Sequence, residues 1–267
     1  MDANPDTSKL SFTAQARLAV SFLTRLPLER IDSAPDQDSN ENQSGHISGS
    51  GDMANAMWLF PLVGFGIGGV GAILLGLLEW IGVPATVAAT LAVGAMIWLT
   101  GALHEDGLAD IADGFGGGKD KAGKLRIMRD SRVGTYGIVS VVIVLLAKIA
   151  ALAALAEWNI GAAAVALIAA ATWSRAMFAP IMRWLEPARD DGLGVNAGNP
   201  NEGTSWLGLA LAAALSLLVL LTSAGFGTII VLAGGGLAAF LVGWIALKQI
   251  GGYTGDVLGA AQQVAEA

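Results

Sequence analysis

The sequence predicts an all-α membrane protein, a polytopic transmembrane bundle of about six helices preceded by an N-terminal interfacial helix. Of its 267 residues, 54% are hydrophobic and only 14% are charged, and the mean hydropathy is +0.60. Soluble domains carry about a quarter charged residues, which argues against an ordinary water-soluble globule. The absence of cysteine excludes disulfide frameworks and thiolate sites. The net charge of -7 argues against nucleic acid as a partner.

Six apolar runs have the length of about twenty residues that a bilayer core requires. Short polar or Gly/Pro breaks separate the two runs of each pair, and longer polar segments separate the pairs. The runs are Met57–Ile81, Ala85–Leu103, Tyr136–Ala156, Ile160–Met182, Trp206–Thr222 and Phe226–Leu247. Small residues recur every four positions in the first run, which favours close helix packing; they are Gly64, Gly68, Ala72 and Gly76. We expect residues 1–267 to form one integral-membrane domain.

The basic residues predict the orientation of these runs. With six crossings, 13 of the 15 lysines and arginines fall on one side, and the hairpin tips on the other side carry none. The positive-inside rule assigns the basic side to the cytoplasm.

Two segments precede the first run. Ser11–Leu28 is apolar but interrupted by Arg17 and Arg25, which favours an amphipathic helix in the membrane interface over a seventh span. Residues 29–56 place six acidic residues among serine, asparagine and glycine. Such a composition buries little apolar surface, so we expect a mobile acidic cytoplasmic loop.

Three aspartates follow the second run, directly after His104. If the helix continues there, Asp106, Asp110 and Asp113 occupy positions i, i+4 and i+7, within about 60° of arc. Carboxylates on one stripe repel one another unless a cation lies among them. Hard oxygen ligands without cysteine suit Mg²⁺ or Mn²⁺ better than zinc. The stripe predicts a magnesium site, and a solvated acidic face is the alternative.

A basic segment follows a glycine-rich stretch and leads into the third run. It contains Arg129, Asp130, Ser131 and Arg132. Arginine forks and small hydroxyls after a set of carboxylates are suited to binding a metal-bound diphosphate. The alternative, a cluster facing lipid phosphates, applies more to the preceding lysines than to these arginines.

Two basic residues lie inside apolar runs, where charge is costly and faces a cavity or a partner. Arg175 lies about two turns from the cytoplasmic end of its run, and both a phosphate contact and snorkelling to the interface remain open. Lys148 lies near the middle of its run, and the sequence assigns it no partner.

Two polar patches share the basic side. One, residues 189–194, contains Asp191; the other, residues 251–260, contains Thr254 and Asp256 and is expected to open a short helix. Each patch alone is typical of a turn. Their shared side with the aspartate stripe makes them candidates for the same site.

In this order, the residues resemble one family, cobalamin synthase, whose members are also called adenosylcobinamide-GDP ribazoletransferases. The resemblance covers nearly the whole chain and is most specific from His104 to Gly114 and from Met128 to Gly134. The matching segments are Phe22–Pro27, Phe60–Gly64, Thr100–Gly114, Met128–Gly134, Asp191–Gly194 and Gly251–Gly259. Glu105 and Arg126 depart from the pattern, which has an apolar and an acidic residue at those positions.

The resemblance implies a Mg²⁺-dependent enzyme in the cytoplasmic (inner) membrane of a prokaryote, with its active site on the cytoplasmic face. It implies the joining of adenosylcobinamide-GDP to α-ribazole, or to its 5′-phosphate. The products are adenosylcobalamin, or its phosphate, and GMP. The partners considered are these substrates, the lipid bilayer, further copies of the chain and other enzymes of cobalamin assembly.

Site residues follow from the resemblance and the residue patterns together. The residues expected in catalysis are Asp106, Asp110, Asp113 and His104. Those expected to bind substrate are Arg129, Asp130, Ser131, Arg132, Arg175, Asp191, Thr254 and Asp256. Those expected to bind metal are Asp106, Asp110, Asp113 and Asp256.

Two other functions fit parts of the pattern. Phosphatidyltransferases of the CDP-alcohol kind carry an Asp-x-x-Asp-Gly-x-x-Ala-Arg run. Residues 110–114 begin similarly, but residues 115–118 do not supply the Ala-Arg. A transporter would place its carboxylates near the bilayer midplane, whereas this aspartate stripe follows the end of an apolar run.

Overall fold

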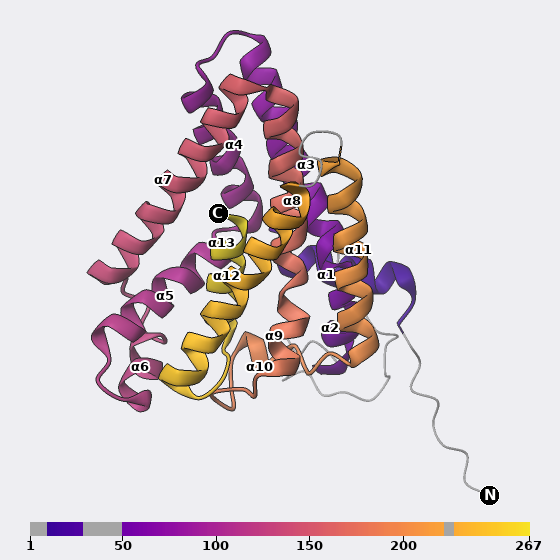
Figure 1. Cartoon of the computed structure of the whole chain (residues 1–267). Helices are drawn as coiled ribbons and strands as arrows, with labels where there is room; N and C mark the ends of the chain where they lie inside the picture. Colours follow the sequence, from indigo (N-terminus) through magenta and orange to yellow (C-terminus); the bar gives the residue numbers. More distant parts are fainter. Residues whose placement is uncertain (1–9, 29–49, 222–226) are drawn as a thin grey trace, which may run out of the picture.

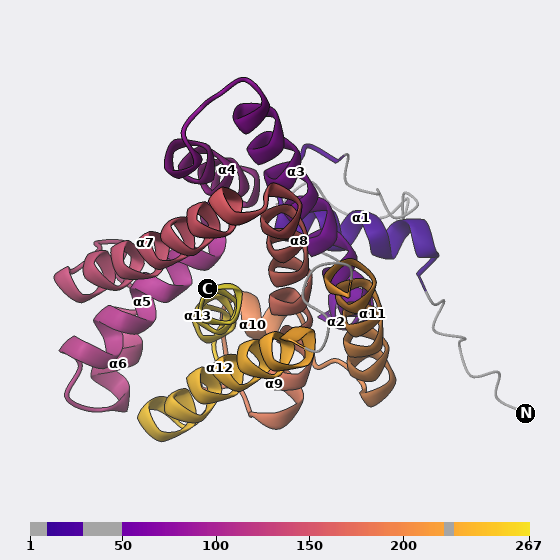
Figure 2. The ribbon, with the colours of Figure 1, turned by 45° about the horizontal axis from the view of Figure 1, so that its top comes forward.

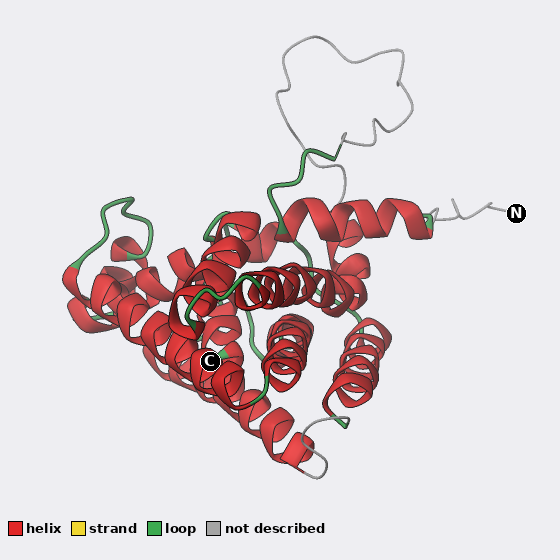
Figure 3. Cartoon of the chain, turned by 90° about the horizontal axis from the view of Figure 1, so that it is seen from above, coloured by secondary structure: helices red, strands yellow, loops and turns green. Residues whose placement is uncertain are grey.

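The computed structural model describes residues 10–28, 50–221 and 227–267, and helix is the regular secondary structure throughout these ranges. Figures 1 and 3 show a bundle of helices joined by loops, with no strand among the described residues. The predicted all-α class is therefore confirmed. Most of the expected acidic loop, residues 29–49, lies outside the described residues.

Five helical segments of the described chain are long and apolar enough to cross a membrane. Four of them contain or coincide with α3 (Phe60–Trp80), α7 (Thr135–Trp158), α8 (Ile160–Ala176) and α11 (Glu202–Leu220), and the fifth lies within α12 (Gly227–Ile250). A sixth candidate is a pair of helices, α4 (Ala85–Thr100) and α5 (Leu103–Gly117), which are bent by 90° relative to each other. Helices therefore occupy all six predicted runs: five belong to segments long and apolar enough to cross a membrane, and the second belongs to the bent pair.

The bend between α4 and α5 lies at two residues in the left-handed region, Gly101 at φ 69° and Ala102 at φ 58°. Their N–H groups donate back to carbonyls of the last turn of α4, and this closes the helix end. Arg25 also caps this end, because its backbone N–H donates to the Leu99 carbonyl over 2.8 Å. The aspartates therefore lie on a separate helix that turns away from α4.

The N-terminal part forms α1 (Phe12–Leu23), α2 (Ser50–Ala56) and the 3₁₀ turn η1 (Met57–Leu59). Helix α1 confirms the helix expected within Ser11–Leu28, while its interfacial position stays a prediction. The prediction that the loop extends to residue 56 is wrong for its last seven residues. Among these, Met53, Ala54 and Ala56 bury their side chains, which supplies the apolar contact that a loop lacks.

The stripe of small residues in α3 packs against α8. A Cβ added at Gly68 would lie 2.7 Å from the Ile168 Cα, so only glycine permits this approach. Figure 2 shows α3 and α8 side by side. Gly64 also faces α8, whereas Gly76 has no atom within 4 Å of an added Cβ. The stripe therefore mediates helix packing as predicted, but only in its first half.

The last helix, α13 (Gly255–Glu266), turns back from the end of α12 into the interior of the bundle. It packs against α5, α8 and α12, and Val257, Ala260 and Ala261 are at most 1% exposed. Figures 1 and 2 show the C-terminus among the other helices. The predicted short helix is confirmed, and its burial makes it part of the core.

The connections α6 (Lys121–Ile127), α9 (Phe178–Trp184) and α10 (Leu193–Asn196) lie at one end of the bundle, at the bottom of Figure 1. We call this end the basic end, because many of the lysines and arginines lie on these segments and beside them. These residues are Lys119, Lys121, Lys124, Arg126, Arg129, Arg132, Arg183, Arg189 and Lys248.

Candidate functional site

A short backbone pairing positions the first part of the site. The segment after α9 runs parallel to the residues before α13, with a bridge between Pro187 and Tyr253. The Ala188 N–H donates to the Tyr253 carbonyl over 2.8 Å. This pairing places Arg189 beside Asp256, and their side chains form an ion pair with 3.5 Å between N and Oδ2.

A cavity of about 120 Å³ lies next to this ion pair. Residues from α1, α3, α5, α9, α10 and α13 line it, together with Arg189. We call it the acidic pocket; its ionisable lining residues are His104, Asp106, Arg189 and Asp256. Five of the six segments that carry the resemblance contribute to its wall. Segments far apart in the sequence therefore meet at one place.

Asp106 of α5 and Asp256 of α13 line the acidic pocket, and Asp110 of α5 lies near both without lining it. Asp106 is exposed and Asp110 half-buried on α5, while Asp256 comes from the first turn of α13. The Asp110 carboxyl group interacts unfavourably with Asp256, Asp106 and Asp113, and favourably with Arg189. Burial raises the pKa of Asp256 above its ordinary value, and the nearby Arg189 opposes this rise.

Asp113 has a different environment from the other two aspartates of the stripe. Its carboxylate is buried and accepts the backbone N–H of Gly134 over 2.6 Å and that of Gly137 over 2.9 Å. These donors belong to the N-terminus of α7, where a negative charge is favourable. Both oxygens of Asp113 thus bind α7, and this contact joins α5 to α7.

His104 contributes a buried ring to the acidic pocket. The residue is 1% exposed, and neither ring nitrogen has a hydrogen-bond partner among the described residues. The ring lies edge-on to Phe178, with 5.9 Å between centroids. Its neighbour Glu105 makes a different contact, accepting a hydrogen bond from Gln263 over 3.0 Å.

Alternating charges extend from the acidic pocket to the loop before α7. Asp191 is paired with Arg129 over 2.6 Å and with Arg189 over 3.6 Å, and Arg189 is in turn paired with Asp256. This charged row brings three of the predicted substrate-binding residues together: Arg129, Asp191 and Asp256.

Three other predicted substrate-binding residues lie apart from the pocket lining. Asp130 pairs with Arg132 over 2.6 Å, and the hydrogen bond from Arg132 lowers the pKa of Asp130 to about 2. Ser131 and Arg132 are exposed at the basic end.

Thr254 is the N-cap of α13 and is 3% exposed. Its hydroxyl oxygen accepts the Val257 N–H over 3.3 Å, and the hydroxyl donates to Asp256 Oδ2 over 3.1 Å. Thr254 therefore caps the start of α13 and, through the same hydroxyl group, orients the Asp256 carboxylate.

Arg175 lies in the interior, away from the acidic pocket lining. Its guanidinium pairs with Glu266 over 2.8 Å, and Lys148 pairs with the other oxygen of Glu266 over 3.0 Å. Lys148 thus has the partner that the sequence did not assign. Glu266 was not singled out from sequence because it lies at the end of a helix expected to be short.

Arg189 is the main site residue that the sequence analysis missed as a ligand-binding group. The sequence interpretation counted it as a basic residue after an apolar run and as the first residue of the patch 189–194, and assigned it no ligand-binding role. In the structure its side chain is 13% exposed, and its Nε and one terminal nitrogen have no hydrogen-bond partner among the described residues. Arg189 precedes the matching segment Asp191–Gly194 by two residues, and this position could have indicated its place in the site.

A divalent metal such as Mg²⁺ requires several oxygen ligands around one point. Within residues 10–28, 50–221 and 227–267, no three histidine or acidic side chains are close enough together to hold a metal ion. Asp113 is occupied by α7. The carboxylates left for a hard cation are those of Asp106, Asp110 and Asp256, whose oxygens are of the type that Mg²⁺ prefers.

The fold and the acidic pocket together define a polytopic helical membrane protein with a charged pocket at one end of its bundle. The chain belongs to the cobalamin-5-phosphate synthase family, whose model matches residues 15–267. It is 42% identical to the adenosylcobinamide-GDP ribazoletransferase of Mesorhizobium japonicum, covering 93% of this chain and 88% of the relative. It is 44% identical to the protein of the same name from Azorhizobium caulinodans, and the match covers 80% of this chain and 82% of that relative. It is 40% identical to the protein of the same name from Bradyrhizobium diazoefficiens, and the match covers 95% of this chain and 90% of that relative. No solved structure matches the chain significantly.

Proposed function

We propose that the acidic pocket transfers the adenosylcobinamide phosphate group from adenosylcobinamide-GDP to a ribose hydroxyl of α-ribazole or its 5′-phosphate. Family membership supports the reaction, and one observation supports the acidic pocket as the location of the active site. Five segments typical of the family meet at the acidic pocket, where carboxylates adjoin an arginine whose side chain is mostly covered.

The reaction exchanges one phosphorus–oxygen bond for another. The hydroxyl oxygen of the acceptor forms a bond to the phosphorus next to cobinamide, and the bond from that phosphorus to the bridging oxygen breaks. GMP leaves with the bridging oxygen, and the hydroxyl proton passes to a base. Such a reaction depends mainly on alignment and on neutralising phosphate charge.

Arg189 is suited to bind the diphosphate because it lines the pocket and one of its terminal nitrogens has no hydrogen-bond or ion-pair partner among the described residues. Arginine grips phosphate oxygens through parallel hydrogen bonds. Arg129, joined to Arg189 through Asp191, supplies a second positive charge from the loop before α7. The charged row therefore provides two cations for the two phosphates.

We propose that Asp106, Asp110 and Asp256 would supply carboxylate oxygens to a Mg²⁺ ion that binds together with the diphosphate, because no three acidic side chains of the described residues are close enough to hold the ion by themselves. When bound, the ion would shield the charge of the phosphate oxygens. The mutual repulsion of these carboxyl groups supports this assignment, since a cation would relieve it. Asp113 instead holds α5 against the start of α7, so we assign it a positioning role.

His104 is the residue that we propose as general base. Its ring lines the acidic pocket and both nitrogens lack a partner among the described side chains and backbone groups. A neutral imidazole nitrogen accepts a proton from a hydroxyl group within hydrogen-bond reach. We place the reaction at the cytoplasmic face of the inner membrane, because the pocket adjoins the basic end.

Release of GMP by the purified protein in lipid nanodiscs tests the proposal. We expect release only when adenosylcobinamide-GDP, α-ribazole and Mg²⁺ are all present. Asp106→Asn should lower the rate at least about a hundredfold, and His104→Gln about 10² to 10⁴-fold. Asp190→Asn is the matched control, because this exposed aspartate does not line the pocket. An Asp106→Asn protein with native turnover would contradict the site assignment.

A further inference from the structure

Helix α6 and the residues on either side of it form a strongly basic segment at the edge of the bundle. Residues 119–132 contain six basic and two acidic residues and therefore carry a net charge of +4, although the whole chain has a net charge of -7. None of these residues lines the acidic pocket. The segment thus concentrates positive charge in a place that the proposed reaction leaves largely unused.

Three of the six basic side chains are exposed and form no hydrogen bond or ion pair with another described residue. They are Lys119, Lys121 and Arg126, and we call them the α6 cations. The other three contact polar groups of the chain. These are Lys124, Arg129 and Arg132. The α6 cations are therefore open to an anion from outside the chain.

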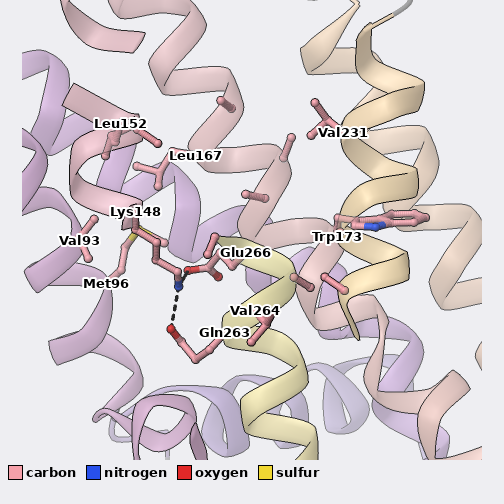
Figure 4. A pocket seen from close by; sticks show the side chains of 18 of the residues that line it. Val93, Met96, Lys148, Leu152, Leu167, Trp173, Val231, Gln263, Val264 and Glu266 are labelled. Atoms are coloured by element: carbon pink, nitrogen blue, oxygen red, sulfur yellow. Dashed lines mark hydrogen bonds and ion pairs between the residues drawn. The ribbon is translucent and has the colours of Figure 1, made fainter. Parts of the chain in front are cut away.

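The cations of the interior differ from these three. Figure 4 shows the Lys148 side chain in the wall of an interior cavity of about 540 Å³, close to Gln263 and Glu266. Its ammonium donates to Gln263 over 2.7 Å and to Glu266 over 3.0 Å. Arg175 contacts the other oxygen of Glu266 over 2.8 Å. Both interior cations thus contact a carboxylate of the chain, which the α6 cations do not.

Helix α6 lies at the level where two apolar spans end. Lys124 of α6 donates a hydrogen bond to Gln249 in the last turn of α12, and the candidate span of α12 ends at the next residue, Ile250. The span of α7 begins at Thr135, a few residues after α6 ends. Figures 1 and 2 both show α6 beside this end of α12, at the edge of the bundle. Lipid that surrounds the spans can therefore reach α6.

Exposed aromatic and apolar side chains mark the same level on both spans. Tyr136 is 59% and Ile138 is 55% exposed at the start of α7, and Trp244 is 46% exposed near the end of α12. The ammonium of Lys248 lies 6.0 Å from the centre of the Trp244 ring. Tryptophan and tyrosine are enriched at the boundary between the hydrocarbon core and the headgroups of a bilayer. The α6 cations therefore lie where phospholipid headgroups are expected.

This combination of groups discriminates between two sources of phosphate. A phospholipid matches both parts of the surface, because its phosphate meets the α6 cations and its acyl chains meet the exposed apolar side chains of α7 and α12. A soluble phosphate or nucleotide would use only the cations. Basic residues next to a span attract anionic lipids, each by about fivefold.

We infer that Lys119, Lys121 and Arg126 bind the headgroups of anionic phospholipids in the membrane leaflet at the basic end. This inference goes beyond the proposed function, because it concerns other residues and a partner that takes no part in the reaction. It is also independent of turnover, since lipid contact can be measured in protein that carries out no reaction.

Quenching of a fluorophore on α6 by labelled lipids tests the inference in the full chain. The native sequence has no cysteine, so Ala122→Cys, at an exposed position of α6, gives a single site for the fluorophore. The nanodiscs contain phosphatidylcholine and a small fraction of quencher, which is phosphatidylglycerol or phosphatidylcholine with a nitroxide near the glycerol end of one acyl chain. We expect the anionic quencher to be enriched beside α6 at least about fivefold over the neutral one, as one basic residue provides. High salt should weaken this enrichment.

Charge variants and a second labelling site provide the controls. Replacing all three α6 cations by glutamine in the labelled protein should bring the two quenchers close to equal effect, with a melting temperature close to native. Arg17→Gln removes an exposed charge from α1, which lies far from α6 in Figures 1 and 2, and should leave the enrichment unchanged. A fluorophore at Thr86→Cys, an exposed position at the start of α4, should show no preference between the quenchers.

Three results would overturn the inference. The first is equal quenching by both lipids beside α6 in the native charge background, or no quenching by either. The second is an equal loss of enrichment in Arg17→Gln and in the triple glutamine variant. The third is loss of the enrichment on adding GMP at constant ionic strength, which would assign the α6 cations to a soluble nucleotide instead of a lipid.

Discussion

The structure separates Asp113 from the other aspartates of its helix, and Asp113→Ala tests this separation. The native carboxylate accepts two backbone N–H groups, over 2.6 and 2.9 Å, at the start of α7. A hydrogen bond to a charged group contributes about 1.5–3 kcal/mol. Partial hydration of the half-buried Gly134 N–H offsets part of the loss, so we expect destabilisation of about 3 kcal/mol. The expected fall in melting temperature is about 6–12 °C.

The assay is thermal unfolding in detergent, followed by GMP release measured well below the melting temperature. Asp113→Asn, which keeps one acceptor oxygen, should lose about half as much stability as Asp113→Ala. Well below their melting temperatures, both variants should release GMP faster than Asp106→Asn. If Asp113→Ala melted like the native protein but released no GMP, Asp113 would act on substrate or metal and our assignment would be wrong.

Further predictions concern the pocket, the interior and the helix packing. Arg189→Gln should raise the KM for adenosylcobinamide-GDP about tenfold or more while the protein stays folded; initial rates would show this, and an unchanged KM would exclude phosphate binding by this residue. Glu266→Gln leaves two buried cations without their counterion and should cost about 3–5 kcal/mol, measured by thermal unfolding; native stability would contradict the pairing. Gly68→Val should cost about 1–3 kcal/mol by overpacking, whereas Gly66→Val, at an open position, should be nearly neutral in the same measurement. Because burial raises the pKa of Asp256 and the ionised form is needed for cation binding, GMP release should fall as pH is lowered, with a midpoint above about 4; a midpoint below this would argue against Asp256.

The transmembrane segments were predictable because a long apolar run is a local property of the sequence. The bend after α4 was not, since Ala102 adopts φ 58° next to a helix end that Arg25 caps from a distant segment. Contacts with distant segments also explain why residues 50–56 form a helix: burial against other elements outweighs their polar local composition.

The sequence predicted which residues belong to the site better than it predicted which contacts they make. Spacing alone placed three aspartates on one helix, as observed. The packing of α7 against α5 decides that Asp113 faces backbone amides instead of the pocket. Likewise, the contact of Arg189 with Asp256 and that of Lys148 with Glu266 join residues far apart in the chain. No local pattern specifies such pairs.

Asp256 gives the most direct test of the proposal that the acidic pocket is the active site, because only folding brings this residue to the aspartates of α5. The measurement is GMP release from adenosylcobinamide-GDP in the presence of α-ribazole and Mg²⁺ by the Asp256→Asn protein. We predict a rate at least about a hundredfold below native, with a melting temperature close to native. Native turnover by this variant would show that the reaction takes place elsewhere.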